Sequence, residues 1–134
     1  MSMSPGDPVP RFERDFSHFL DYLHDDQMPT SISPKRFAKA LGMDLQTFAI
    51  KSQMHHDALC RTPTTERVQH RLRESLRVLR AAIDRTSNVE KAVFWFKNIS
   101  LSAFDDKTAL DLVAEGRTEA LICYIQSLEA GFIG

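Results

Sequence analysis

Few side chains in this 134-residue chain have the type and spacing that catalysis or metal binding requires. His55, His56 and Cys60 are of the types that bind zinc, but no fourth ligand stands at a suitable spacing. The adjacent aspartates at 25–26 and 105–106 have the positions of helix ends or helix caps. No motif for an activated serine nucleophile, a phosphate-binding loop or a zinc-binding helix occurs. We therefore expect a protein that is not an enzyme, with no catalytic residue, no metal and no cofactor.

The charges are distributed unevenly along the chain, although the net charge is only −1. Residues 1–32 carry a net charge of −4, residues 33–85 carry +6 and residues 86–134 carry −3. A basic middle between two acidic ends favours one surface for a polyanion and another surface for a different partner. The alternative is that these lysines and arginines only solvate helix faces.

Two short helices in the basic middle are separated by a turn of the kind found in a helix-turn-helix. Ser33 and Pro34 have the properties of a helix cap and a first helical residue, and Gly42 ends this helix. Asp44 then caps a second helix that begins at Leu45. We expect the inner face of the first helix to consist of Phe37, Ala38 and Leu41. A turn this short that contains glycine is typical of a helix-turn-helix, and an ordinary αα-hairpin in a helical core is the alternative.

The second helix of a helix-turn-helix lies in the major groove of DNA, where each base pair presents its own pattern of donors and acceptors. Its exposed early positions here would be Leu45, Gln46, Ala49, Ile50 and Gln53. The residues that we expect to read bases are Gln46, Thr47, Ile50 and Gln53, and those that we expect to contact phosphates are Lys35, Arg36, Lys39 and Lys51. In such a helix the residue three positions after Phe48 usually faces the core again, but that residue here is Lys51. Either Ile50 faces inward instead, or the helix is shorter or rotated.

The spacing of apolar residues predicts the helices on either side of this pair. A first helix starts at Arg11, and its apolar face consists of Phe12, Phe16, Phe19, Leu20 and Leu23. A longer helix begins near Thr64 or Thr65 and carries the apolar stripe Val68, Leu72, Leu76, Leu79 and Ile83. Arg73, Arg77 and Arg80 form a second stripe on another face of this helix. That stripe is a phosphate-binding edge, a site for an acidic partner or simply a solvated face.

Three further helices are predicted near the carboxyl end. Ser87 and Glu90 have the spacing of a capping box at the start of the first of them. Asp105 or Asp106 opens the second, which is short. The glycines that end the last two helices are Gly116 and Gly131. No strand-like alternation competes with these patterns, so we predict an all-α fold with a helix-turn-helix module and a C-terminal helical interaction module.

The patterns divide the chain into four segments. We expect a mobile tail over residues 1–10, a helix-turn-helix DNA-binding domain over 11–62, a long connecting helix over 63–85 and a C-terminal helical domain over 86–134. The amino end lacks the features of a signal peptide, and no apolar run is long enough to span a membrane. The two cysteines lie far apart and have no partner motif, so a soluble, cytoplasmic protein without membrane contact is expected.

The carboxyl third contains three short motifs in a characteristic order. Ala92 and Trp95 form an A-x-x-W helix, Leu110 and Leu112 lie in a short middle helix, and Leu128 with Gly131 ends a closing helix. In this order the motifs resemble the toxin-binding domain of the Xre/MbcA/ParS antitoxin family. The helix-turn-helix and the long helix also stand where that family has them, so the resemblance covers about residues 30–134.

The resemblance implies a dimeric DNA-binding protein that represses its own operon. In that family the C-terminal, antitoxin-like domain covers the active site of a cognate toxin, often of the NAD-consuming RES type, and members without a toxin are free-standing regulators. We therefore expect a sequence-specific regulator that binds double-stranded DNA as a homodimer. Neutralisation of an RES-type toxin is the alternative, and a helical adaptor without DNA affinity is a third. The residues that would contact a protein partner are Trp95, Phe132 and Ile133, although Trp95 also has the properties of a core residue.

Overall fold

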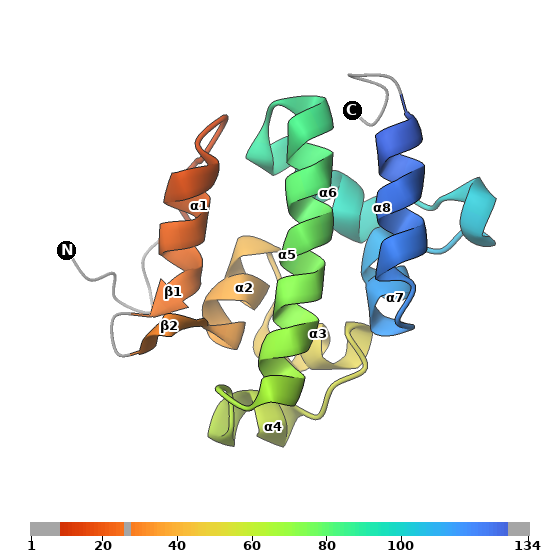
Figure 1. The fold of residues 1–134 in the computed structure, drawn as a ribbon. Coiled ribbons are helices and arrows are strands. Elements are labelled where there is room, and N and C mark those ends of the chain that lie inside the picture. Colours follow the sequence, from red (N-terminus) through yellow and green to blue (C-terminus); the bar gives the residue numbers. More distant parts are fainter. Residues whose placement is uncertain (1–8, 26–27, 129–134) are drawn as a thin grey trace.

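The longest helix, α5 (Glu66–Thr86), lies at the centre of the computed structural model, with the other elements arranged around it (Figure 1). The structure describes residues 9–25 and 28–128. The other elements in this part are α1 (Phe16–Leu23), β1 (His24–Asp25), β2 (Met28–Ile32), α2 (Pro34–Ala40), α3 (Leu45–Lys51), α4 (His56–Arg61), α6 (Val89–Asn98), the 3-10 helix η1 (Ser102–Phe104), α7 (Ala109–Ala114) and α8 (Thr118–Ser127). The prediction of an all-α fold is confirmed to this extent: the described part of the chain is mostly helical, with one short two-stranded hairpin.

The predicted apolar stripe of α5 forms the middle of the hydrophobic core. Val68, Leu72 and Leu79 are fully buried, and Ile83 is only 6% exposed. Leu76 is half-buried, because it lies at the edge of the stripe. Helix α5 packs against α6, α7, α8 and β2, so it connects the two halves of the chain through one continuous core. Within the described residues, no helix is long and apolar enough to cross a membrane.

A short antiparallel hairpin of β1 and β2 follows α1 and was not predicted from the sequence. Its last residue is held by a buried side chain of α5 rather than by an alternating pattern of its own. The Gln69 amide accepts a hydrogen bond from the Ile32 N–H at 2.9 Å and donates one to the Ile32 carbonyl at 2.8 Å. The same amide donates to the Pro63 carbonyl at 2.8 Å. A side chain thirty-seven positions away therefore completes the backbone pairing of the strand.

The first helix starts later than the sequence predicts. It begins at Phe16 rather than Arg11, with Asp15 accepting a hydrogen bond from the His18 N–H as its cap. The preceding residues are bound to α6 instead. The Glu90 carboxylate accepts hydrogen bonds from the N–H groups of Phe12 and Glu13, at 3.0 and 2.9 Å. Phe12 is buried nonetheless, packing edge-on against Phe19 of α1.

Two predicted helix caps near the carboxyl end are wrong. Asn88, not Ser87, caps α6 by accepting a hydrogen bond from the Lys91 N–H at 2.9 Å. Ser87 instead ends α5 in a left-handed conformation, and Glu90 is engaged by the amino-terminal segment.

The aspartates at 105 and 106 are also left-handed and lie before α7, whose capping box consists of Thr108 and Asp111. Gly116 ends α7 as predicted, with a φ of +79°. Gly131 lies outside the described residues, and α8 ends at Ser127.

Candidate functional site

Helices α2 and α3 form where the sequence predicts them, joined by residues 41–44. The Ser33 hydroxyl accepts a hydrogen bond from the Arg36 N–H at 3.2 Å, and Pro34 is the first helical residue. Gly42 has a φ of +74°, a conformation that side chains with a Cβ rarely adopt. Asp44 then caps α3 by accepting a hydrogen bond from the Thr47 N–H at 2.7 Å. These four residues therefore mark the start and end of α2 and the start of α3.

The inner faces of the two helices meet around a pair of aromatic rings. Phe37 and Phe48 are both fully buried, and their ring centroids lie 5.6 Å apart. Ala49 is also buried, at 2% exposure, so the prediction that it faces outward is wrong. The reason is the rotation of α3, whose inner edge consists of Phe48, Ala49 and Ser52. The Ser52 hydroxyl completes this edge by donating to the Phe48 carbonyl at 2.6 Å.

The outer face of α3 decides between the two alternatives for Lys51, which were an inward-facing Ile50 and a shorter or rotated helix. Ile50 is 72% exposed, so it does not replace a core residue at that point, and the helix ends at Lys51. Gln46 and Lys51 are exposed on the same short helix. Thr47 is half-buried and hydrogen-bonds the Asp44 carboxylate, which lowers the pKa of Asp44. Gln53 lies beyond the helix end, in a left-handed conformation.

The basic residues predicted to contact phosphate differ in their exposure and in the groups that they contact. Lys35 is exposed at the amino end of α2 and Lys39 is half-buried on the same helix. Arg36 is engaged inside the protein: its guanidinium donates to the Tyr22 carbonyl at 3.2 Å and lies 5.4 Å from the centroid of the Tyr22 ring. Burial raises the pKa of Tyr22, with the positive charge of Arg36 acting in the opposite direction. The contacts of Arg36 thus attach α2 to the end of α1.

Two cations that the sequence did not single out bind backbone carbonyls on either side of α3. The Lys97 ammonium of α6 donates to the Leu41 carbonyl in the turn before α3, and the Arg71 guanidinium of α5 donates to the Ser52 carbonyl after it. Burial, and secondarily the charge of Arg67, lowers the pKa of Arg71. These contacts join residues 56 and 19 positions apart, so no local sequence pattern predicts them.

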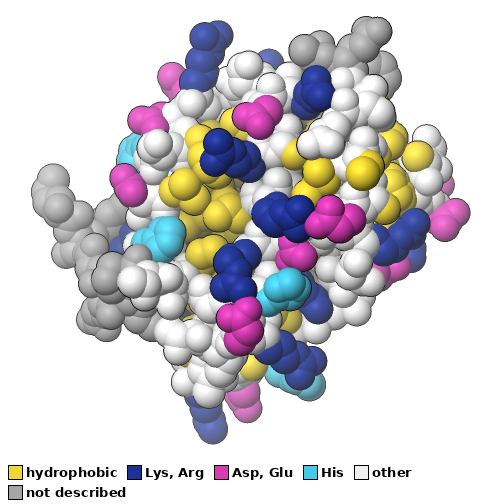
Figure 2. Space-filling model, in the orientation of Figure 1, with side chains coloured by type: hydrophobic (Ala, Val, Ile, Leu, Met, Phe, Trp, Pro, Cys, Tyr) yellow, Lys and Arg dark blue, Asp and Glu magenta, His cyan; other side chains and the backbone are white. Residues whose placement is uncertain are grey.

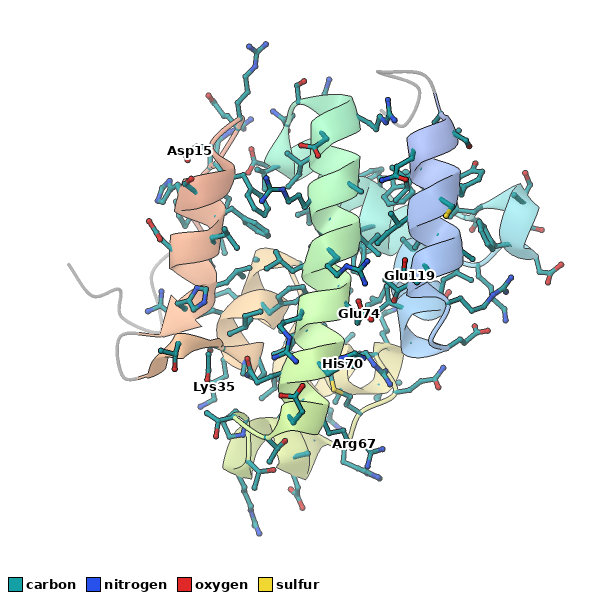
Figure 3. All side chains as sticks on the ribbon, viewed as in Figure 1. Asp15, Lys35, Arg67, His70, Glu74 and Glu119 are labelled. Carbon is teal, nitrogen blue, oxygen red and sulfur yellow. The ribbon has the colours of Figure 1, made fainter. Side chains whose placement is uncertain are left out.

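The surface around α4 and the start of α5 is rich in positive and titratable groups. Arg61 and Arg67 are exposed there, as are His55 and His56. Figure 2 shows Lys, Arg and His side chains together with Asp and Glu side chains at this end of the molecule, and Figure 3 labels Arg67 on α5 and Lys35 on α2. Asp57 and Glu66 are exposed on the same segments, so the formal charges of the two arginines are balanced there.

The histidine and cysteine cluster on α4 is smaller than a metal site. The Cys60 sulfur lies 3.6 Å from Nε2 of His56 and 3.8 Å from its Nδ1, one helical turn away. No group of three or more metal-binding side chains occurs in the described part of the chain. Together, these residues form one hydrogen-bonding pair on an exposed helix.

The residues predicted to contact a protein partner lie in different environments. Trp95 is 3% exposed and packs in the core. Phe132 and Ile133 lie outside the described residues. The apolar side chains that α6 and its end do expose are Phe94, at 57%, and Ile99, at 38%. Both border a hollow of about 320 Å³ together with Arg11.

No protein-family model, curated protein or solved structure matches the chain.

Proposed function

We propose that α2, residues 41–44 and α3 act as a helix-turn-helix, and that the protein is a transcriptional regulator that binds double-stranded DNA. The observation that carries this proposal is the division of α3 into two faces. One face is buried through Phe48, while Gln46 and Ile50 point into solvent. Arg71 of α5 binds the carboxyl end of this helix, and Lys97 of α6 binds the turn before it. An exposed helix held rigidly by its neighbours is what insertion into a major groove requires.

The exposed residues suit different parts of the DNA. The amide of Gln46 can donate and accept at the major-groove edge of adenine, and the apolar side chain of Ile50 suits the methyl group of thymine. Lys35, Lys39 and Lys51 supply positive charge on both helices for the phosphate backbone. Arg36 contributes instead by attaching α2 to α1, because its guanidinium is occupied by Tyr22.

The regulator acts as a homodimer on a palindromic or repeated site. A single α3 of seven residues reaches only a few base pairs, so two copies are needed for specificity. In this proposal the half-sites are spaced by about one turn of the DNA helix, roughly 34 Å.

The test is binding of the purified protein to the promoter fragment of its own gene and to a random duplex of equal length, across a series of salt concentrations. We expect tighter binding to the promoter and a steep salt dependence. Replacing both Lys35 and Lys39 by glutamate should weaken binding to both duplexes and flatten the salt dependence. Gln46→Ala should weaken binding to the promoter by roughly tenfold and leave random DNA unaffected.

The matched control is Lys91→Glu, which reverses an exposed lysine on α6 and should leave binding nearly unchanged. Equal losses for Gln46→Ala on both duplexes would contradict base reading by this residue. No preference for the promoter at any salt concentration would contradict the proposed function and favour the helical adaptor.

A second candidate function is neutralisation of an RES-type toxin through the C-terminal half. The exposed Phe94 favours it, because a large apolar side chain in solvent is a common anchor for a protein partner. Phe94→Ser should then abolish growth rescue in cells that express such a toxin and leave DNA binding intact. Deletion of residues 129–134 tests the predicted contribution of Phe132 and Ile133 in the same assay. Rescue that survives both changes rules out these contacts.

A further inference from the structure

A groove with an apolar floor runs between α1 and α5, on the side of the molecule away from α6. Its volume is about 500 Å³, and its lining includes Phe16 and Leu20 from α1 and Leu76 from α5. All three of these side chains are half-buried, so they present apolar surface to the groove. In Figure 2 the hydrophobic side chains between α1 and α5 are visible from outside, with dark-blue Lys and Arg side chains beside them. The groove is therefore open to solvent and large enough for a small molecule.

The rim of this groove is formed by the arginine stripe of α5. Arg73, Arg77 and Arg80 line it, together with His70 and a single carboxylate, that of Glu74. Two of the three arginines already have carboxylate partners. Arg73 pairs with Glu66, and Arg77 contacts both Glu74 and Glu119 at 2.8 Å. Figure 3 shows Glu74 and Glu119 close together, between α5 and α8, where Arg77 joins the two helices.

Arg80 differs from its two neighbours. Its guanidinium lies 5.0 Å from the centroid of the Phe16 ring, and no carboxylate of the described residues forms an ion pair with it. The contact with Phe16 holds the positive charge over the apolar floor of the groove. A guanidinium has five N–H donors in a planar fork, so the stacked group keeps the capacity to bind a carboxylate through two hydrogen bonds.

We propose that this groove is a binding site for a small amphipathic ligand with one carboxylate group and an apolar chain. The carboxylate binds the guanidinium of Arg80, and the chain covers Phe16, Leu20 and Leu76. The single negative charge follows from the charges of the rim, because only one of its three arginines lacks a carboxylate partner within the described residues. A dianionic phosphate would instead have to displace Glu74 and Glu119 from Arg77, whose hydrogen bonds with these two groups raise the pKa of Arg77.

The site goes beyond the proposed DNA interface and does not depend on it. None of the residues lining the groove belongs to α2 or α3, so a failure of DNA binding leaves this inference standing. The sequence left three alternatives open for the arginine stripe, and this proposal develops one of them, a site for an acidic partner.

The experiment is a calorimetric titration of the full chain with three probes of equal chain length, below the concentrations at which they aggregate. The probes are decanoate, which has the predicted charge, decanol, which is neutral, and the decyltrimethylammonium cation. We expect saturable binding of one decanoate per chain and binding of decanol weaker by roughly tenfold, the contribution of one charge-assisted hydrogen bond pair. The cation should bind more weakly still.

Two variants and a control assign the binding to the groove. Arg80→Gln removes the charge from an exposed position and should weaken decanoate binding by roughly tenfold while leaving decanol unaffected. Leu20→Glu places a carboxylate at the floor and should abolish decanoate binding. Lys91→Gln removes a positive charge from α6, outside the groove, and should bind decanoate like the unmodified protein. Circular dichroism and the urea midpoint of each variant confirm that it is folded.

Several results would overturn the proposal. Equal affinity for the three probes would show that charge is not recognised, and equal losses for Arg80→Gln and Lys91→Gln would show that only net charge matters. Absence of saturable decanoate binding would exclude a carboxylate ligand. If Arg80→Gln instead dissociated a dimer in sedimentation, a second copy of the chain would be the occupant of the groove.

Discussion

The chain contains two helix pairs built on the same local plan. In the first, α2 and α3 are joined by residues 41–44, and in the second, α7 and α8 are joined by residues 115–117. The first helix of each pair is followed by a glycine in a left-handed conformation, Gly42 at a φ of +74° and Gly116 at +79°. Phe48 of α3 and Leu121 of α8 are both fully buried in the one core that α5 connects.

The two pairs differ in how the rest of the protein holds their turns. A Cβ added at Gly42 would lie 2.9 Å from the Lys97 ammonium, which donates to the Leu41 carbonyl in the same turn. A Cβ added at Gly116 would have no heavy atom within 4 Å. The turn at Gly116 therefore has no such contact with a distant residue, whereas the turn at Gly42 also contacts Lys97 of α6. This difference concerns the turns alone, because α8 is itself held by a distant part of the chain: it packs against α5, and Arg85 of α5 donates to the Gln126 carbonyl at 2.7 Å.

The largest predicted effect on stability comes from the buried side chain that each helix pair contributes to the common core. Phe48→Ala should lower the free energy of unfolding by about 4 kcal/mol, and Leu121→Ala by about 3 kcal/mol, because each removes a fully buried side chain and leaves a cavity. Both variants should still unfold in one transition, since α5 joins the two pairs in one core. Urea unfolding followed by circular dichroism and by Trp95 fluorescence measures this. Two separate transitions for either variant would show that the pairs are independent units.

The next effect concerns the two glycines. Gly116→Ala should lower the free energy of unfolding by about 1 kcal/mol, the strain of a left-handed alanine. Gly42→Ala should lower it by about 2 kcal/mol, because the new Cβ also displaces the Lys97 ammonium from the Leu41 carbonyl. Urea titrations of both variants at one pH and one salt concentration provide the comparison.

A double-mutant cycle isolates the contribution of the lysine. In a Lys97→Met background the contact with the Leu41 carbonyl is absent, so Gly42→Ala and Gly116→Ala should have the same effect there. A difference between the glycines that persists without the Lys97 ammonium would place its origin in the turn itself.

The sequence predicted the parts of both pairs that depend on neighbouring residues. Ser33, Pro34, Gly42 and Asp44 act as predicted, and so does Gly116, because a cap or a left-handed glycine needs only the backbone a few positions away. The apolar stripe of α5 was also predictable, since its spacing repeats over five turns of a helix.

The parts that failed depend on partners far along the chain. Phe12 has the spacing of a helix residue, but its N–H binds the Glu90 carboxylate 78 positions away, so α1 starts later. The same bond keeps Glu90 from acting in a capping box with Ser87. At the candidate site, Gln46 and Ile50 were placed correctly as exposed residues, whereas Ala49 is buried and Leu45 is half-buried against the core. A periodicity identifies an apolar face but does not fix the rotation of a seven-residue helix, which the packing against Phe37 decides.

The smallest predicted effect is a difference in the pH dependence of stability, because the two helix pairs have helix caps of different chemistry. Asp44 caps α3 with a carboxylate, and Thr108 caps α7 with a hydroxyl, which does not titrate. The hydrogen bonds of Thr47, chiefly from its N–H, lower the pKa of Asp44 in the folded protein below the 3.8 of an unperturbed carboxyl. The contribution of Asp44 to stability is therefore complete above the unfolded pKa and is lost as the pH falls through the folded pKa.

Asp44→Asn provides the test, because asparagine caps a helix about as well as aspartate but does not titrate. Between pH 5 and pH 3 the unmodified protein should lose more stability than Asp44→Asn, as measured by urea unfolding at each pH. Thr108→Ala should instead lower stability by about 1 kcal/mol, equally at both values. Parallel pH profiles for Asp44→Asn and the unmodified protein would mean that the carboxylate is bound no more tightly than a neutral cap.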